Sequence, residues 1–251
     1  MEKVIFLSDT HFKYKVITDE EIEKRKLFIS FINDSKGVSR LYLLGDIFDF
    51  WFEHKGTEPS YYQDIISALT KLKDSGTKIY IIGGNHDYWL GHYIEEVIGN
   101  KVLPELYTET IQGRNITMTH GDMLLRGNFG YKILRAVIRN RLTIKLAERI
   151  SPTLLFAFAS RFSRTSKGIT HKRTERSAKE LIERAKAEFF KWENDAFIMG
   201  HIHYPYHETI DGKDFIILGD WEEHYSYAVL EGGVFTLERY LPGKKTLSEN
   251  L

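Results

Sequence analysis

Three short apolar runs in the first third of the chain limit its possible folds more strongly than any other part of the sequence. Residues 3–8, 40–45 and 78–82 are almost continuously apolar, which is typical of strands that are buried on both faces. Helical patterns separate these runs, at residues 18–33 and 61–73. Strand, helix, strand, helix and strand, joined by short turns, predict parallel crossover units in an α/β layer.

The pattern changes after Pro104. Residues 106–111 and 115–119 predict a hairpin, and residues 126–191 predict several helices. Five further strands are expected in the last quarter of the chain, at residues 196–199, 206–210, 215–218, 225–230 and 234–240. We therefore expect one domain over residues 1–251, with a helical segment at about 123–191 inserted between two strand-rich halves.

Composition excludes several kinds of protein. The 251 residues are 42% hydrophobic and 28% charged, which is enough apolar material for a sizeable core and excludes a disordered chain. There is no cysteine, so thiol catalysis and thiolate metal sites are excluded. No apolar run approaches the ~20 residues that cross a bilayer, and no secretory signal precedes the first predicted strand. These features predict a cytoplasmic protein.

Basic residues are concentrated in the inserted segment, although the whole chain has a net charge of zero. Residues 123–191 contain 17 Lys and Arg but only 5 Glu and no Asp. Because aliphatic residues are interleaved with these cations, the segment predicts a basic helical lid that contacts an anionic membrane surface and binds acyl chains. The alternative for each apolar position is an ordinary core-facing stripe. A nucleic-acid partner is not expected, since few aromatic residues in the segment could stack on bases.

Metal-binding residue types follow five of the predicted strands. The strands end in Asp9-Thr-His11, Gly45-Asp46, Gly84-Asn85-His86-Asp87, His120-Gly-Asp122 and Gly200-His201-Ile-His203. Ligands of α/β sheets bind at the carboxyl ends of the strands, so these five turns should converge. Seven of the side chains form a mixed set of oxygen and imidazole ligands that suits Mn²⁺, Fe²⁺ or Zn²⁺: Asp9, His11, Asp46, Asn85, His120, His201 and His203. Seven ligands suit two ions that lie about 3.5–4 Å apart.

This ordered series resembles the calcineurin-like metallophosphoesterases, whose pattern is D-x-H, G-D, G-N-H-[DE], H and G-H-x-H. The resemblance implies two facing sheets flanked by helices and a centre of two divalent ions, for which we expect Mn²⁺, with Fe²⁺ or Zn²⁺ as alternatives. It implies that the first ion is held by Asp9, His11, Asp46 and His203. It implies that the second is held by Asp46, Asn85, His120 and His201, so that Asp46 bridges the two. His86, paired with Asp87, would then contact the substrate phosphate or protonate the leaving group.

Longer stretches are similar to one branch of that family, the UDP-2,3-diacylglucosamine pyrophosphohydrolases of lipid A synthesis. They cover residues 45–51, 120–122, 200–205 and 218–221. The similarity implies cleavage of the substrate's pyrophosphate to UMP and 2,3-diacylglucosamine 1-phosphate. From the basic lid we expect a peripheral location on the cytoplasmic face of the inner membrane, and no obligate protein partner is expected. It implies that Arg164, Ser166 and Lys167 of the lid contact the substrate. We expect Asn85, Asp122 and Arg161 to bind the substrate as well, and orientation of His120 is the alternative role of Asp122.

Two positions next to the predicted ligands depart from that branch. His86 and Tyr204 stand where the branch commonly has Arg. The first alternative is therefore a phosphodiesterase or pyrophosphatase of the same fold that acts on another nucleotide or lipid phosphoester. A non-catalytic metal-binding scaffold is the second alternative, although such proteins usually lose ligands that this chain retains.

Overall fold

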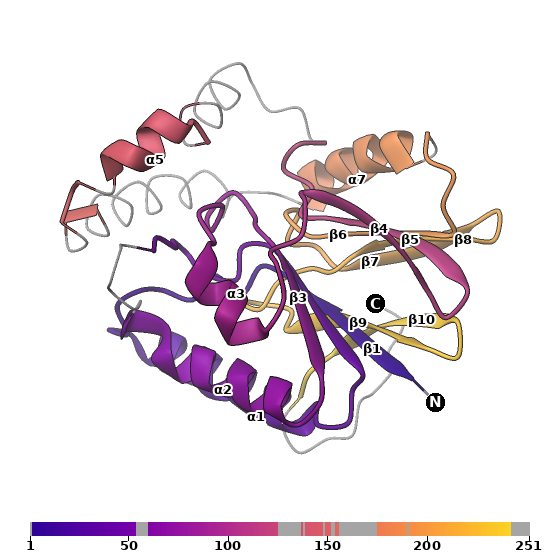
Figure 1. Cartoon of the computed structure of the whole chain (residues 1–251). Helices are drawn as coiled ribbons and strands as arrows, with labels where there is room; N and C mark the ends of the chain where they lie inside the picture. The colour runs from indigo at the N-terminus through magenta and orange to yellow at the C-terminus, as the bar shows by residue number, and fades with distance from the viewer. Residues whose placement is uncertain are drawn as a thin grey trace.

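The computed structural model describes residues 2–53, 60–124, 137, 139–147, 149–151, 154, 155, 175–189 and 191–241. Within these ranges the strands form two five-stranded sheets (Figure 1). The first sheet has the order β10-β9-β1-β2-β3. Its strands are β1 (Lys3–Leu7), β2 (Arg40–Leu44), β3 (Lys78–Ile82), β9 (Ser226–Glu231) and β10 (Val234–Arg239). The strands β1, β2 and β3 are parallel, as predicted. The structure also places β9 antiparallel to β1.

The second sheet combines the predicted hairpin with strands that follow the inserted segment. Its order is β4-β5-β6-β8-β7, in which β5, β6 and β8 are parallel. The strands are β4 (Leu106–Ile111), β5 (Arg114–Thr119), β6 (Ala196–Met199), β7 (Tyr206–Ile210) and β8 (Lys213–Ile217). The expected arrangement of two sheets flanked by helices is therefore confirmed.

Alternation along the strands builds the layers of the core. Val4 and Phe6 of β1 point between the two sheets, whereas Ile5 and Leu7 point to the helices on the outer face. The helices α1 (Asp19–Asp34) and α2 (Gln63–Asp74) cover that outer face (Figure 1). Because both faces of β1 are buried, its sequence is a continuous apolar run rather than an alternating one.

Local signals explain where the helices lie. Thr18 caps α1, because its side-chain oxygen accepts a hydrogen bond from the Glu21 amide at 3.3 Å. The short helix α3 (His92–Ile98) was not predicted, since its seven residues are too few for a periodic pattern. A 3₁₀ turn at Ser60–Tyr62 precedes α2.

The described parts of the inserted segment include two helices with different surroundings. The helix α5 (Arg141–Ala147) lies beyond the carboxyl ends of the strands, and α7 (Glu175–Phe189) covers the outer face of the second sheet (Figure 1). Ile182 and Phe189 of α7 are at most 2% exposed and pack against Phe197 and Phe215. Burial of such side chains contributes about 1.5–3 kcal/mol each, so α7 belongs to the core and only part of the inserted segment can act as a lid. Among the described helices, none has the length and the apolar character needed to cross a membrane.

Candidate metal centre

The five polar motifs meet at the carboxyl ends of β1, β2, β3, β5 and β6, as predicted. Backbone hydrogen bonds join the neighbouring turns: the Asp9 amide donates to the Gly45 carbonyl at 3.1 Å, and the Gly200 amide donates to the His120 carbonyl at 3.1 Å. The first of these bonds links two turns of the first sheet, and the second links two turns of the second sheet. Side-chain contacts then connect the two sheets across the site, since the His201 amide donates to Asp9 Oδ2 at 2.9 Å.

The backbone at these turns is in a conformation that L-residues rarely adopt. Five candidate ligands have a positive φ: Asp9 (55°), His11 (44°), Asp46 (53°), His201 (68°) and His203 (60°). The left-handed region is costly for residues that carry a Cβ, and such strain is concentrated at functional sites. The sharp turns direct consecutive polar side chains into one volume instead of to opposite faces of a strand.

Two glycines allow the turns to approach so closely. A Cβ on Gly84 would lie 2.1 Å from Asp46 Oδ1, and one on Gly200 would lie 2.4 Å from Asp9 Oδ2. Both contacts are shorter than any real Cβ contact, and the atoms in the way belong to candidate ligands. The glycines of the G-N-H-D and G-H-I-H motifs are therefore required by packing at the site.

The first group of candidate ligands consists of Asp9, His11 and His203. Asp9 Oδ1 lies 3.1 Å from His203 Nε2 and 3.7 Å from His11 Nε2, and the two imidazole nitrogens are 3.2 Å apart. Asp9 is fully buried, and its Oδ1 makes no hydrogen bond among the described residues. A buried carboxylate oxygen without a hydrogen bond, next to two imidazole nitrogens, fits the ligand set of a divalent cation.

The second group consists of Asp46, His120 and His201. His120 Nε2 lies 3.3 Å from Asp46 Oδ2 and 3.2 Å from the Asn85 side-chain oxygen. The other ring nitrogen of His120 is 3.0 Å from the Leu44 carbonyl, so Nδ1 carries the proton and Nε2 can bind a metal. Asp46 Oδ2 is also 3.7 Å from His11 Nε2, which places this carboxylate between the two groups.

The carboxylates shift the pKa values of their histidine neighbours. Burial alone would lower the pKa of His120, but the negative charge of Asp46 and the contact with it raise that pKa well above its usual value. Burial likewise would lower the pKa of His203, whereas the charge of Asp9 raises it overall. The same negative charges attract a divalent cation, which must compete with these protons for the imidazole nitrogens.

The residues present therefore fit the two divalent ions that the motif implies. Oxygen atoms and imidazole nitrogens gather in three overlapping groups, of which the third, His11, Asp46 and His86, shares a residue with each of the other two. No thiolate is present in the chain. The structure thus brings together all seven predicted ligands, with Asn85 joined through its contact to His120.

His86 lies at the edge of this centre and has a different partner from the one expected. Its ring packs edge-on against His11 with 4.8 Å between the ring centroids, and its Nδ1 is 3.1 Å from the Asp49 carbonyl oxygen. Asp49 Oδ1 also approaches both rings, at 3.6 Å from His86 Nδ1 and 3.8 Å from His11 Nδ1. Asp49 thus positions the rings of His86 and His11. The sequence did not reveal this role, because it depends on the path that the chain takes in the turn after β2.

Asp87, which was predicted to act with His86, binds the backbone of two turns in the structure. Its carboxylate is fully buried and accepts hydrogen bonds from the backbone amides of Gly84, Asp46, Ile47 and Phe48, at 2.7 to 3.2 Å. Burial and the negative charge of Asp46 raise the pKa of Asp87 to about 6, while these amides act in the opposite direction. With both oxygen atoms engaged by backbone amides, Asp87 holds the turns after β2 and β3 together.

A buried charged cluster on α1 supports the turn that carries Asp9 and His11. Lys24 Nζ donates to the His11 carbonyl at 3.0 Å and lies 3.1 Å from Glu21 Oε2. Glu21 in turn accepts a hydrogen bond from the Lys13 amide at 2.9 Å. Glu21 and Lys24 are only 1% and 5% exposed. Both charged residues lie on the buried face of α1, together with Phe28 and Phe31. Charged residues at apolar positions of a helical pattern are the sequence signal that could have revealed this cluster.

The predicted substrate-binding residues are only partly within the described residues. Asp122 is 4% exposed, and its Oδ2 lies 3.2 Å from a guanidinium nitrogen of Arg139 in the inserted segment. That guanidinium also lies over the Tyr88 ring, 4.1 Å from its centroid. The remaining lid residues, Arg161, Arg164, Ser166 and Lys167, lie outside the described residues.

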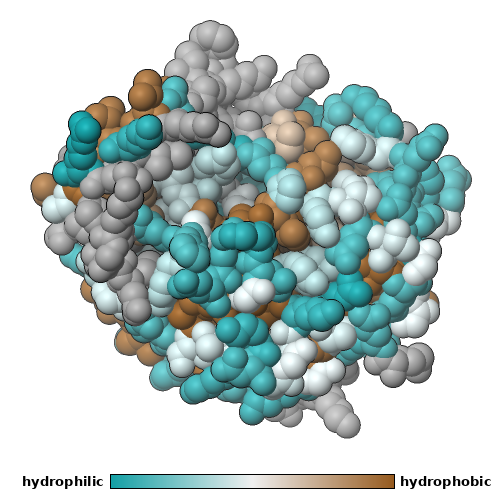
Figure 2. Space-filling model, viewed as in Figure 1, coloured by the Kyte–Doolittle hydropathy of each residue, from teal (hydrophilic) through white to brown (hydrophobic). Residues whose placement is uncertain are grey.

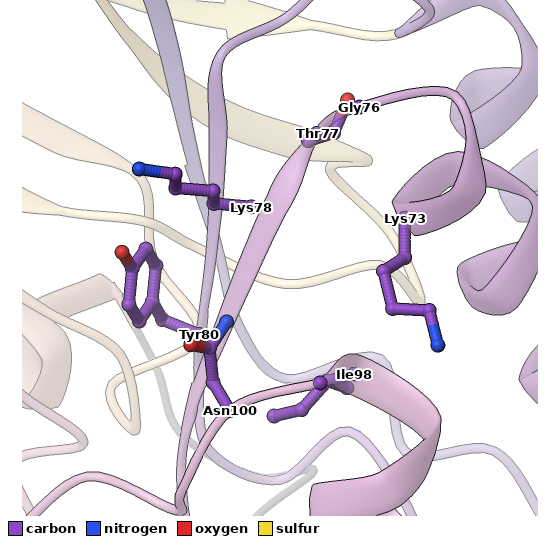
Figure 3. A pocket seen from close by; sticks show the side chains of 8 residues that line it. Lys73, Gly76, Thr77, Lys78, Tyr80, Ile98 and Asn100 are labelled. Atoms are coloured by element: carbon purple, nitrogen blue, oxygen red, sulfur yellow. The ribbon is translucent and has the colours of Figure 1, made fainter.

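A separate pocket of about 380 Å³ lies at the opposite end of β3 (Figure 3). Its lining includes Lys73, Lys78, Tyr80 and Asn100. Asn100 is engaged in holding the strand, because its side-chain amide donates to the Ile79 carbonyl at 2.8 Å. The pocket contains none of the predicted ligands and sits at the amino ends of the parallel strands, so we do not associate it with the metal centre.

Comparison with known proteins agrees with this geometry. Residues 2–205 match the calcineurin-like phosphoesterase family, and the chain belongs to that family. It is therefore a metallophosphoesterase, as the motifs predicted.

More specific similarities extend over nearly the whole chain. It is 27% identical over 255 residues to a UDP-2,3-diacylglucosamine hydrolase from Porphyromonas gingivalis, covering 94% of this chain and 97% of that protein. It is also 27% identical over 246 residues to the protein of that name from Stenotrophomonas maltophilia, covering 93% of this chain and 97% of that protein. Among solved structures, vacuolar protein sorting 29 from Cryptosporidium parvum aligns over 99% of this chain and 98% of its own, with 15% identity and a TM-score of 0.49.

Proposed function

We propose that this metallophosphoesterase cleaves the pyrophosphate of UDP-2,3-diacylglucosamine, releasing UMP and 2,3-diacylglucosamine 1-phosphate. The observation that carries the proposal is the cluster of carboxylate and imidazole groups joined by Asp46, in a chain whose relatives of that name align over 87–94% of it. A pyrophosphate is doubly anionic, so its reacting oxygens need positive charge on both sides of the scissile bond.

We assign Asp9, His11, Asp46 and His203 to one divalent ion and Asp46, Asn85, His120 and His201 to the other. Two divalent ions supply Lewis-acid stabilisation of the phosphoryl oxygens and make a water molecule nucleophilic at neutral pH. The ligand chemistry suits Mn²⁺, which we propose as the physiological metal, with Fe²⁺ or Zn²⁺ as the alternatives to be tested.

His86 is proposed to act on the leaving group or the substrate phosphate. Its ring lies against His11 and is 17% exposed, so one edge can meet a ligand. The Asp49 carbonyl oxygen 3.1 Å from Nδ1 accepts a hydrogen bond from it, which leaves Nε2 to face the reacting groups. An imidazole held in this way can stabilise a departing oxygen or donate a proton to it.

We further propose that the inserted segment binds acyl chains and meets the anionic cytoplasmic face of the inner membrane. Exposed apolar side chains gather at α5 and beside it: Val137 (52%), Leu142 (68%), Leu146 (59%), Ile150 (43%) and Leu154 (66%). Figure 2 shows hydrophobic atoms next to hydrophilic ones in the region where Figure 1 draws α5. Lys145 and Arg149 are exposed among them, and apolar side chains with adjacent cations are typical of helices at anionic bilayers.

Product analysis by mass spectrometry tests the proposed reaction. The Mn²⁺-loaded protein is incubated with UDP-2,3-diacylglucosamine in detergent, and UMP and diacylglucosamine 1-phosphate should appear in equal amounts. The Asp46→Asn variant, which lacks the central carboxylate, serves as the blank. Absence of both products, with rapid hydrolysis of bis(p-nitrophenyl) phosphate, would refute the substrate and favour another nucleotide or lipid phosphoester.

A further inference from the structure

An Asp–His pair outside the candidate ligands lies in the turn between β8 and β9. Asp220 is 3% exposed, and its Oδ1 accepts hydrogen bonds from the three backbone amides of residues 222–224, at 2.7 to 3.2 Å. Its Oδ2 lies 2.8 Å from His224 Nδ1. Because a carboxylate can only accept, this contact makes His224 Nδ1 the donor and fixes the orientation of the ring.

The second ring nitrogen of His224 is available for a ligand. Nε2 has no hydrogen-bond partner among the described residues, and the side chain is 30% exposed. In the tautomer that carries its single proton on Nδ1, the imidazole offers Nε2 as an acceptor. Two further acidic residues, Glu222 and Glu223, are close in the same turn, so a neutral hydroxyl donor suits this place better than an anionic phosphate.

The turn is attached to one end of the metal centre. The Trp221 amide donates to the Asp9 carbonyl at 3.1 Å, next to the first group of candidate ligands. Tyr204 directly follows His203 in the chain, and its ring centroid lies 6.3 Å from that of His224. His224 and Tyr204 therefore adjoin the Asp9 and His203 side of the centre.

The inserted segment adjoins the opposite side of the metal centre, where His120 lies. Asp122 follows His120 by two residues and contacts Arg139 of that segment at 3.2 Å. If the inserted segment binds the acyl chains, as the proposed function requires, the sugar half of the substrate extends toward Arg139. The nucleotide half then extends from the reacting phosphates in the opposite direction, toward Tyr204 and His224.

We infer that His224 and Tyr204 form the nucleoside subsite, in which His224 Nε2 accepts a hydrogen bond from a ribose hydroxyl. The direction of the substrate in this inference rests on the proposed function. Tyr204 borders the subsite with an aromatic ring at the position where the related branch commonly has a cation. Asp220 acts as a positioning residue, because it contacts His224 and not the ligand.

Binding of three probes to the metal-loaded protein, measured by isothermal titration calorimetry, tests this subsite. UMP and ribose 5-phosphate both carry the ribose, whereas inorganic phosphate reports on the metal centre alone. A single hydrogen bond contributes about 0.5–1.5 kcal/mol, so His224→Ala should weaken both ribose-containing probes by about 2- to 13-fold. Inorganic phosphate should bind with unchanged affinity, and His224→Gln, which keeps an acceptor, should retain most of the affinity for UMP.

His207→Ala is the matched control, since His207 also pairs with a carboxylate, at 2.8 Å from Asp214, but on β7. It should leave all three affinities unchanged. Equal weakening of UMP and inorganic phosphate by His224→Ala would overturn the inference, because His224 would then act through the metal centre. Unchanged UMP binding would also overturn it. If His224→Ala bound UMP more weakly but ribose 5-phosphate with unchanged affinity, the contact with a ribose hydroxyl would be refuted. Failure to cleave the UDP-lipid, with His224-dependent UMP binding retained, would refute only the proposed substrate.

Discussion

Asp46 is the side chain on which the two halves of the metal centre depend. Its Oδ2 lies 3.3 Å from His120 Nε2 and 3.7 Å from His11 Nε2, whereas its Oδ1 accepts a hydrogen bond from the His86 amide at 2.8 Å. Asp46→Asn keeps the acceptor for that amide and removes the negative charge between the groups. We expect this variant to fold, to lose both bound metal equivalents, and to lose activity by more than the 10- to 100-fold typical of outer-shell changes.

Metal content measured by plasma mass spectrometry, alongside circular dichroism, checks this expectation. Asp214→Asn is a suitable control, because Asp214 is also buried and contacts a histidine, but it lies in β8 away from the metal centre. The control should retain full metal content. Two metal equivalents retained by Asp46→Asn would show that this carboxylate does not bridge the ions.

The turns after β2 and β3 behave as one structural element, because Asp87 connects them through four amide hydrogen bonds. Asp87→Ala leaves these buried amides without an acceptor, and each unsatisfied donor costs about 1–3 kcal/mol. We therefore expect the free energy of unfolding to fall by at least about 3 kcal/mol in urea denaturation, together with weaker metal binding. His86→Ala, in the neighbouring position, should lower turnover but keep both stability and metal content. A stable Asp87→Ala variant that lacked only activity would restore the direct catalytic role.

The difference between the predicted and observed site has a physical origin. The ligand-bearing turns could be predicted, since parallel strands place their carboxyl ends at one edge and the motif residues follow each strand directly. Asp49 and His224 could not be predicted as neighbours of the centre. Asp49 depends on the path of the turn after β2, and His224 depends on the return of β9 beside β1, which is a contact between distant parts of the sequence. Helix periodicity also could not separate α7, which packs on a sheet, from α5, whose leucines are exposed.

The distribution of apolar surface over the whole molecule leads to a prediction about membranes. Leu142 and Leu146 are one helical turn apart on α5 and are 68% and 59% exposed, with Lys145 exposed between them. Transfer of each leucine into a bilayer interface is favourable by up to about 1.5–3 kcal/mol. The double variant Leu142→Glu with Leu146→Glu should therefore bind vesicles containing anionic phospholipid at least about tenfold more weakly, because it loses apolar contact and adds repulsion.

Vesicle co-sedimentation measures this binding, and hydrolysis of bis(p-nitrophenyl) phosphate shows whether the metal centre is intact. Val234→Glu is the matched control, since Val234 is 63% exposed but lies on β10, in the sheet that α1 and α2 cover. We expect the control to bind vesicles as the unmodified protein does, and both variants to hydrolyse the small diester normally. Binding should also weaken with added salt, because exposed charges such as Lys145 are screened beyond about 8 Å at physiological ionic strength. Equal vesicle binding by the α5 variant and the control would place the membrane contact elsewhere on the protein. The α5 leucines would then contact only the acyl chains of the substrate.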